Sequence, residues 1–316
     1  MTDLGDLKQL DPRTVWPNEP QNFTPWLADN LPKLGEALGL ELEFQGRESP
    51  VGKLSVDLIA KDVGRNKIVV IENQLELSDH RHLGQLIAYA AGKEAGVVVW
   101  VCRELLEEHR QAIDWLNRGG LNAEFFGVRL ELLQVDNSKP AVSFRCVSFP
   151  NNWFRQSRSG TSSELTPTQT AYCNFFQRLL DELREKHKFT NGRVAPPQNW
   201  YSFSTGVRGL SYGVSFAKEQ KLQAELYIDI KDPDKNLEIL KWLRSKADTL
   251  QKEFDDKLEW EDLEDRQGCR VACYRDGSIH DSQDKLEEYQ AWFVDRLLRF
   301  KKVFGPILPK INSVKS

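Results

Sequence analysis

A run of seven apolar residues, Gly96 to Cys102 (GVVVWVC), limits the possible folds of this chain more than any other stretch. A strand with one exposed face alternates apolar and polar residues, whereas an unbroken apolar run is typical of a strand covered on both faces. Helical patterns flank the run, from Ser78 or Asp79 to about Ala95 and from Arg103 to Asn117, and another extended segment spans Glu124 to Val135. This order predicts the α/β class, with a mixed sheet flanked by helices.

An amphipathic helix is expected near the N-terminus, because apolar residues recur at helical spacing from Phe23 to Leu40. Thr24 is a suitable N-cap, with Pro25 at the first helical position, and Pro32 can kink or break the helix. An extended stretch should follow it.

Two β-prone runs come next, Lys53 to Ala60 and Lys67 to Gln74, separated by the turn-forming segment Asp62 to Asn66. They predict a β-hairpin. A turn that is symmetric about the bond between Gly64 and Arg65 pairs residues whose numbers sum to 129.

An acidic pair results from this register, because Asp57 lies directly across from Glu72, and Gln74 projects to the same face as Glu72. Facing carboxylates repel each other, and a divalent cation would relieve the repulsion. Oxygen ligands suit Mg²⁺ or Mn²⁺, with the main-chain carbonyl of Asn73 as a further candidate ligand. The alternative is that these are ordinary charged residues on a solvated sheet face, in a register shifted by one or two residues.

Composition excludes some classes and leaves others open. No apolar run approaches the roughly 18 residues needed to cross a bilayer, and the polar N-terminus does not resemble a signal peptide, so a cytoplasmic location is expected. The five scattered cysteines do not form a disulfide pattern. A net charge of −4 gives no general attraction to phosphate, so nucleic acid would have to be bound by local Lys and Arg clusters.

Domain organisation is indicated by residues 155–164 (RQSRSGTSSE), whose composition is typical of a linker. We expect a first domain over residues 1–154, a linker over 155–165, and a smaller α+β domain over 166–316. A helix should open the second domain, since Thr166, Pro167 and Gln169 supply an N-cap, an N1 proline and a capping-box glutamine. Further elements are expected at residues 200–216, 222–230 and 258–274 (strands), and at 233–254 and 282–304 (helices).

The motifs VDLIA with Asp57, VVIENQ with Glu72 and Gln74, and a following helix with QLIAY resemble the PD-(D/E)XK nuclease superfamily over about residues 20 to 135. Together with GKLSVDLIA, HRQAIDWLN and FFGVRLELLQV, they resemble, over nearly the whole chain, a family of uncharacterised bacterial proteins that joins such a core to a C-terminal domain of unknown function.

The resemblance implies that Asp57 and Glu72 bind metal and that Gln74 takes the place of the usual catalytic lysine. A glutamine amide can orient water but brings no charge. Lys53, Lys67 or Lys93 could supply that charge. Glu36, on the first helix, could approach the metal from the side, or it could lie on a solvated helix face.

Gln85 and Tyr89 form a QxxxY pair, and His82 shares their helix face. The pair resembles a motif of RecB-like nucleases that lies beside the metal and contacts nucleic acid, so Gln85, Tyr89 and His82 are candidate nucleic-acid-binding residues. His82 could bind phosphate or relay protons, or it could simply cap the helix.

Two functions remain open from the sequence. One is a Mg²⁺- or Mn²⁺-dependent nuclease that hydrolyses DNA, or RNA, in restriction, repair or defence, possible as a homodimer because a single centre cuts one strand at a time. The other is a non-catalytic module that binds nucleic acid or a protein partner. In that second case, aromatic residues of the C-terminal domain could stack bases, although core packing is the commoner role of such residues. They are Trp200, Tyr201, Phe203, Tyr212, Trp242, Trp260, Tyr274 and Trp292.

Overall fold

The structure, a computed structural model, describes residues 4–52, 54–150, 165–263 and 268–313. The chain divides into two compact units, Met1–Asp62 with Asn66–Gln156 (unit 1) and Val63–Arg65 with Ser157–Ser316 (unit 2). The predicted linker lies outside the described residues, apart from Leu165. The expected fold class is confirmed, since a mixed sheet flanked by helices is followed by a separate antiparallel sheet.

Unit 1 is built on a seven-stranded sheet in the order β1-β6-β5-β4-β3-β2, with β7 also paired to β6. Strands β4, β5 and β6 run parallel to one another, and the other pairings are antiparallel. The strands are β1 Leu7–Leu10, β2 Leu42–Val51, β3 Leu54–Asp62, β4 Lys67–Leu77, β5 Val97–Glu104, β6 Glu124–Val135 and β7 Ala141–Ser148.

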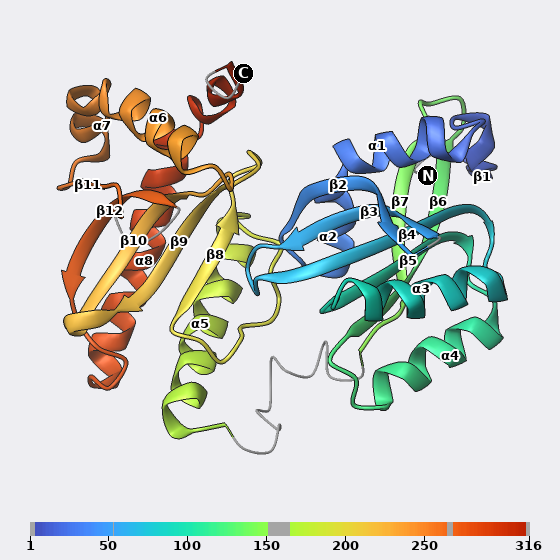
Figure 1. Cartoon of the computed structure of the whole chain (residues 1–316), viewed down its shortest axis with the longest axis horizontal. Helices are drawn as coiled ribbons and strands as arrows, with labels where there is room; N and C mark the ends of the chain where they lie inside the picture. Colours follow the sequence, from blue (N-terminus) through green and yellow to red (C-terminus); the bar gives the residue numbers. More distant parts are fainter. Residues whose placement is uncertain (1–3, 53, 151–164, 264–267, 314–316) are drawn as a thin grey trace. The chain divides into compact units, whose positions relative to one another are not determined.

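Helices cover both faces of this sheet, with α3 and α4 together on one face (Figure 1). The helices are η1 Pro12–Thr14, η2 Glu19–Phe23, α1 Thr24–Asp29, α2 Leu31–Leu38, α3 His80–Gly92 and α4 Glu107–Arg118. Strand β5 confirms the expectation for the apolar run, because Val97 to Cys102 are all buried and both neighbouring strands are parallel. Trp100 packs against Leu86 of α3 and Ile113 of α4 in one cluster.

The first α-helix, α1, starts at Thr24, close to the predicted start, but the N-cap role predicted for Thr24 is wrong. A turn of π-helix, η2, already runs from Glu19 to Phe23, and Asn18 caps it with its side chain, with a proline in its first turn. The Asn18-Glu19-Pro20 segment thus carries the same signal as Thr24-Pro25, six residues earlier. The break expected near Pro32 is confirmed, since α1 ends at Asp29 and α2 starts at Leu31.

The hairpin register is confirmed. Strands β3 and β4 pair from Asp62↔Lys67 to Leu58↔Ile71, and each pair sums to 129. The regular pairing ends at Leu58↔Ile71, so Asp57 and Glu72 are the next residues on their strands, at the point where the ladder stops. The site described below lies at this end of the hairpin.

Unit 2 contains a five-stranded antiparallel sheet in the order β11-β12-β10-β9-β8. Its elements are α5 Pro167–Glu185, β8 Trp200–Ser204, β9 Leu210–Ala217, η3 Lys218–Gln220, β10 Lys221–Ile228, α6 Pro233–Arg244, α7 Ala247–Phe254, β11 Glu259–Glu261, β12 Cys269–Asp276, α8 Gln283–Phe304 and η4 Leu308–Ser313. The capping box of Thr166 and Gln169 is present. The helix expected over 233–254 is divided in two, because the Ser245 hydroxyl donates to the Trp242 carbonyl where α6 ends.

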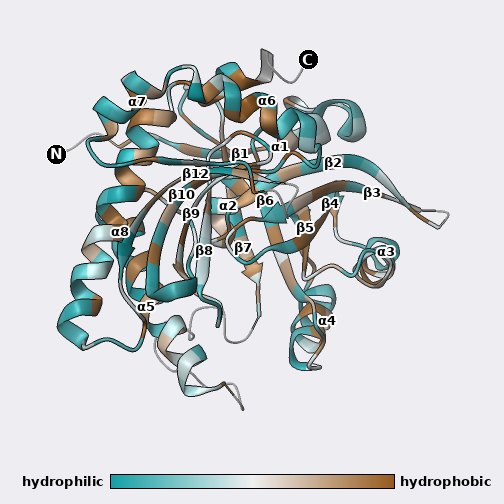
Figure 2. Cartoon of the chain, turned by 60° about the vertical axis from the view of Figure 1, so that its left-hand side comes forward, coloured by the Kyte–Doolittle hydropathy of each residue, from teal (hydrophilic) through white to brown (hydrophobic). Residues whose placement is uncertain are grey.

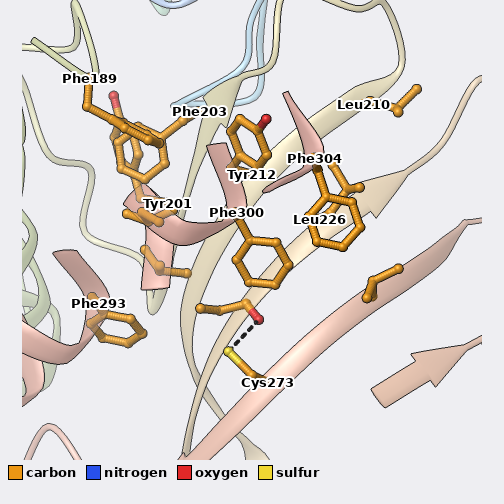
Figure 3. Packing of buried hydrophobic residues seen from close by; sticks show 14 of the residues in the cluster. Phe189, Tyr201, Phe203, Leu210, Tyr212, Leu226, Cys273, Phe293, Phe300 and Phe304 are labelled. Carbon is orange, nitrogen blue, oxygen red and sulfur yellow. Dashed lines mark hydrogen bonds between the residues drawn. The ribbon is translucent and has the colours of Figure 1, made fainter. Parts of the chain in front are cut away.

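The core of unit 2 is rich in aromatic side chains, several of which pack face to edge (Figure 3). The Cys273 thiol lies in this core and donates to the Ala224 carbonyl at 3.7 Å. Six of the aromatic residues considered for base stacking are buried in this core or packed against it, so for them the core interpretation is confirmed. They are Tyr201, Phe203, Tyr212, Trp242, Trp260 and Trp292.

The helices of both units carry hydrophilic and hydrophobic residues along the same helix, as amphipathic elements that cover a sheet should (Figure 2). Among the described residues, no helix is long and apolar enough to span a membrane. All five cysteines are free thiols.

Candidate metal-binding active site

Asp57 is held by Asn73, the residue that follows Glu72 on β4. Oδ2 of Asp57 accepts a hydrogen bond from the Asn73 backbone nitrogen at 2.9 Å and another from the Asn73 side-chain amide at 2.6 Å. The same amide nitrogen donates a second hydrogen bond to the hydroxyl oxygen of Thr24 at 3.2 Å. Burial nevertheless raises the pKa of Asp57, against the lowering effect of the Asn73 hydrogen bonds. Asn73 thus fixes the position of the first carboxylate.

Glu72 is the most strongly perturbed carboxyl of the site. Its side chain is only 4% exposed, and Oε2 is buried without a hydrogen-bond partner among the described residues. Burial, then repulsion from Asp57, then repulsion from Glu19 raise its pKa to about 9. The oxygens of a buried carboxylate normally have hydrogen-bond or metal partners. Oε2 of Glu72 could therefore accept a partner that binds to the site from outside the protein.

Glu19 is a third carboxylate in the site, and the sequence analysis missed it. Its Oε2 accepts from the Leu75 backbone nitrogen at 2.6 Å, which joins η2 to β4. Burial and the charge of Asp57 raise its pKa. Glu36, the acidic residue considered for this role, is exposed on α2. The Asn18 cap and Pro20 were the available signal, because they start the helical turn that carries Glu19.

No lysine or arginine within the described ranges forms an ion pair with Asp57 or Glu72. Two of the lysines expected to replace the motif lysine are engaged elsewhere, since Lys67 pairs with Glu124 at 2.9 Å and Lys93 donates to Ser49 at 2.7 Å. Lys53 lies outside the described residues. Among the residues that the structure describes, Asp57 and Glu72 are therefore not neutralised by direct contact with a lysine or arginine.

Gln74 lies beyond Glu72 on β4 and is buried. Its carbonyl accepts from Trp100 Nε1 at 2.8 Å, and its amide donates to the Leu77 carbonyl at 2.5 Å and to Asp79 Oδ2 at 3.5 Å. Both ends of the side chain are thus bound within the protein. Gln74 secures the end of β4 to β5 and to the start of α3.

Tyr89 and Gln85 lie on α3 beside the same carboxylates. The Tyr89 hydroxyl donates to the Ser55 carbonyl at 2.8 Å and receives the Gln85 amide at 3.4 Å. Burial and then the charges of Glu72 and Asp57 raise the pKa of Tyr89 to about 12. Gln85 Oε1 is buried without a hydrogen-bond partner among the described residues. The QxxxY pair thus lies next to the acidic group.

His82 lies in the first turn of the same helix, and its charge lowers the pKa of both Asp57 and Glu19. Its Nδ1 is 2.7 Å from Asp79 Oδ2, and its backbone nitrogen donates to Asp79 Oδ1 at 2.9 Å. Burial opposes ionisation of Asp79, but the hydrogen bonds from His82 outweigh it and keep the pKa of Asp79 below its usual range.

Asp57, Glu72 and Glu19 supply carboxylate oxygens, the donor type that hard divalent cations prefer. In the described part of the chain, no group of three or more His, Cys, Asp or Glu residues could by itself hold a metal ion. Mg²⁺ does not require one, because it usually keeps several waters and binds through one or two carboxylates together with substrate phosphates. The orphaned Oε2 of Glu72, beside Asp57 and Glu19, has the chemistry of such a ligand.

Comparison with known proteins finds one matching family and one similar solved structure. Residues 171–308 match the profile of a family described as a domain of unknown function (DUF4268), which lies within the predicted second domain. A search of curated proteins finds no match. A solved structure described as a repair endonuclease from Pyrococcus abyssi is similar over 31% of this chain and 42% of its own, at 20% identity and a TM-score of 0.26. So low a score establishes neither fold nor activity, and that match covers less than half of the endonuclease.

Proposed function

We propose that unit 1 is a metal-dependent phosphodiesterase acting on DNA, with Asp57 and Glu72 as metal ligands and Glu19 beside them. One observation carries this proposal: Glu72 is buried beside two other carboxylates, its Oε2 has no hydrogen-bond partner within the described part of the chain, and its pKa is raised to about 9. Such an arrangement destabilises the metal-free protein. A divalent cation bound by the carboxylates would offset that cost and is the simplest function for them.

The choice of DNA rests on the resemblance of the VDLIA, VVIENQ and QLIAY motifs to the PD-(D/E)XK nucleases. When bound, Mg²⁺ or Mn²⁺ would supply an acidified water and neutralise charge at phosphorus. Asn73 holds the Asp57 carboxylate in place through two hydrogen bonds, and its main-chain carbonyl is a further ligand candidate. Gln85 and Tyr89, which lie on α3 beside the carboxylates, would position the strand.

Cleavage assays with matched variants test the proposal. Plasmid and single-stranded DNA are incubated with the protein and Mg²⁺ or Mn²⁺. Glu72→Ala should abolish cleavage, while Glu36→Ala, which removes an exposed carboxylate of the same unit, should leave it intact. Equal cleavage by wild type and the Glu72 variant would refute the proposal.

A second function is favoured by the state of Gln74. Because its amide and carbonyl are bound to Trp100, Leu77 and Asp79, this side chain has little capacity to orient an attacking water. The alternative is therefore a nuclease-like module that binds nucleic acid or a protein partner without cutting. DNA binding in a gel-shift assay, with no cleavage by wild type in either metal, would favour this second function.

A further inference from the structure

His82 is fixed in one tautomer by its hydrogen bond to Asp79. The carboxylate of Asp79 is ionised, since its pKa is held low, so it accepts the bond at 2.7 Å and the proton resides on Nδ1 of His82. In the neutral ring, Nε2 then carries the lone pair. The side chain of His82 is 22% exposed, so water reaches it.

The position of His82 separates it from the other histidines of unit 1. His80 Nδ1 is 2.7 Å from His109 Nε2, and His109 Nδ1 is 2.8 Å from the buried Ser78 hydroxyl, so those two rings are linked to each other and to the start of α4. His82 Nδ1 instead shares Asp79 Oδ2 with the side-chain amide of Gln74 on β4, at 2.7 Å and 3.5 Å. This contact places the His82 imidazole at the end of β4 that carries Glu72, and its charge lowers the pKa of Asp57 and of Glu19.

The proposed hydrolysis needs a group that accepts the proton of the attacking water, because Gln74 takes the place of the usual PD-(D/E)XK lysine. Among the described residues, Arg13 acts on Glu19, Arg81 acts on Glu72, and His82 acts on Asp57 and Glu19. An arginine cannot give up its proton in a protein, whereas an imidazole exchanges one near neutral pH. Gln74 has no basic atom, and Lys67 and Lys93 are bound elsewhere.

We infer that His82, oriented by Asp79, is the general base that accepts the proton of the attacking water; this inference rests on the proposed function. The water oxygen forms a bond to phosphorus, and its proton passes to Nε2. The bond from phosphorus to the leaving oxygen breaks with its electron pair on that oxygen, which takes a proton from solvent. The imidazolium, stabilised by the Asp79 carboxylate, then returns its proton to solvent.

Three measurements on the full chain test this role. His82→Ala should lower the cleavage rate by about 10²- to 10⁴-fold, and added imidazole should restore part of it, which would not occur if the side chain were merely structural. His280→Gln, an exposed site in unit 2, is the matched control. Mn²⁺ affinity measured by calorimetry should be the same in wild type and His82→Ala, because His82 is not a ligand. Nitrogen-15 NMR should show the Nδ1-protonated tautomer in wild type and its loss in Asp79→Asn.

The outcomes separate this inference from the proposed function. If wild type cleaves, Glu72→Ala does not, and His82→Ala retains more than a tenth of the rate, the general base is refuted while the metal site stands. A tenfold loss of Mn²⁺ affinity in His82→Ala, or the other tautomer in wild type, also refutes it. Absence of cleavage by wild type refutes both. His82→Gln, which keeps a donor for Asp79, replaces the alanine variant if that one does not fold.

Discussion

Replacing Glu72 with glutamine should stabilise the metal-free protein, by an amount that grows with pH. Glutamine has nearly the shape of a protonated carboxyl but stays neutral at every pH. It therefore removes the cost of ionising a group that is 4% exposed and faces two other carboxylates. The expected gain follows from the pKa of Glu72 in the folded and unfolded chain.

The pKa of Glu72 is about 9 in the fold against an ordinary value of 4.5. Because the pKa of Glu72 is higher in the folded chain than in the unfolded chain, the contribution of this carboxyl to stability is complete below pH 4.5. That contribution is lost as pH rises towards 9. Each pH unit costs about 1.4 kcal/mol, so the roughly 2.5 units up to pH 7 amount to about 3 kcal/mol. Glu72→Gln should be more stable than wild type by about this much at pH 7, and hardly at all near pH 4.5.

The assay is urea unfolding in EDTA from pH 5 to pH 8, followed by hydrogen exchange of peptides from β4, so that unit 1 is observed apart from unit 2. Glu36→Gln, at an exposed position, is the control and should show no such pH-dependent gain. Saturating Mn²⁺ should stabilise wild type but not Glu72→Gln. A gain below about 1 kcal/mol at pH 7, or one that does not change with pH, would contradict the burial and repulsion described for this carboxyl.

Three further predictions concern other contacts. Trp100→Phe removes the donor to Gln74 Oε1 and should lower the free energy of unfolding of unit 1 by about 1 to 3 kcal/mol; an unchanged urea midpoint would argue against this contact. Burial and then the neighbouring His80 lower the pKa of His109, so its stabilising effect is complete above its ordinary pKa of 6.5 and is lost as pH falls below it. The stability gap between wild type and His109→Gln should thus narrow from pH 8 to pH 5, and a constant gap would refute this. Thr166→Ala, which removes the cap of α5, should cost unit 2 about 1 kcal/mol in urea unfolding, with no change in unit 1.

Much of the fold could be predicted because its signals are local. The apolar run at Val97 to Cys102 indicates a central strand from hydrophobicity alone, and the short, symmetric turn sets the β3–β4 register. The first helix was harder, since Asn18 and Thr24 both precede a proline and only packing decides which one begins the helical structure. The break between α6 and α7 has no proline or glycine to mark it.

The site was only partly readable for a similar reason. Asp57, Glu72 and Asn73 are placed by a hairpin, so their proximity follows from register. Glu19 lies 56 residues before Leu75 in the chain and reaches the site through a hydrogen bond to the Leu75 backbone, which no sequence pattern indicates. The engagement of Gln74 by Trp100 likewise depends on the pairing of β4 with β5, which a single strand does not reveal.

The central claim is that a divalent cation binds between the carboxylates of β3 and β4. Crystals of the full chain grown with Mn²⁺ provide the most direct test, because anomalous scattering identifies the ion independently of activity. We predict an anomalous peak in contact with Glu72 and Asp57 that disappears in Glu72→Gln. The claim would be contradicted by crystals at saturating Mn²⁺ in which both carboxyls are well ordered and no peak lies beside them.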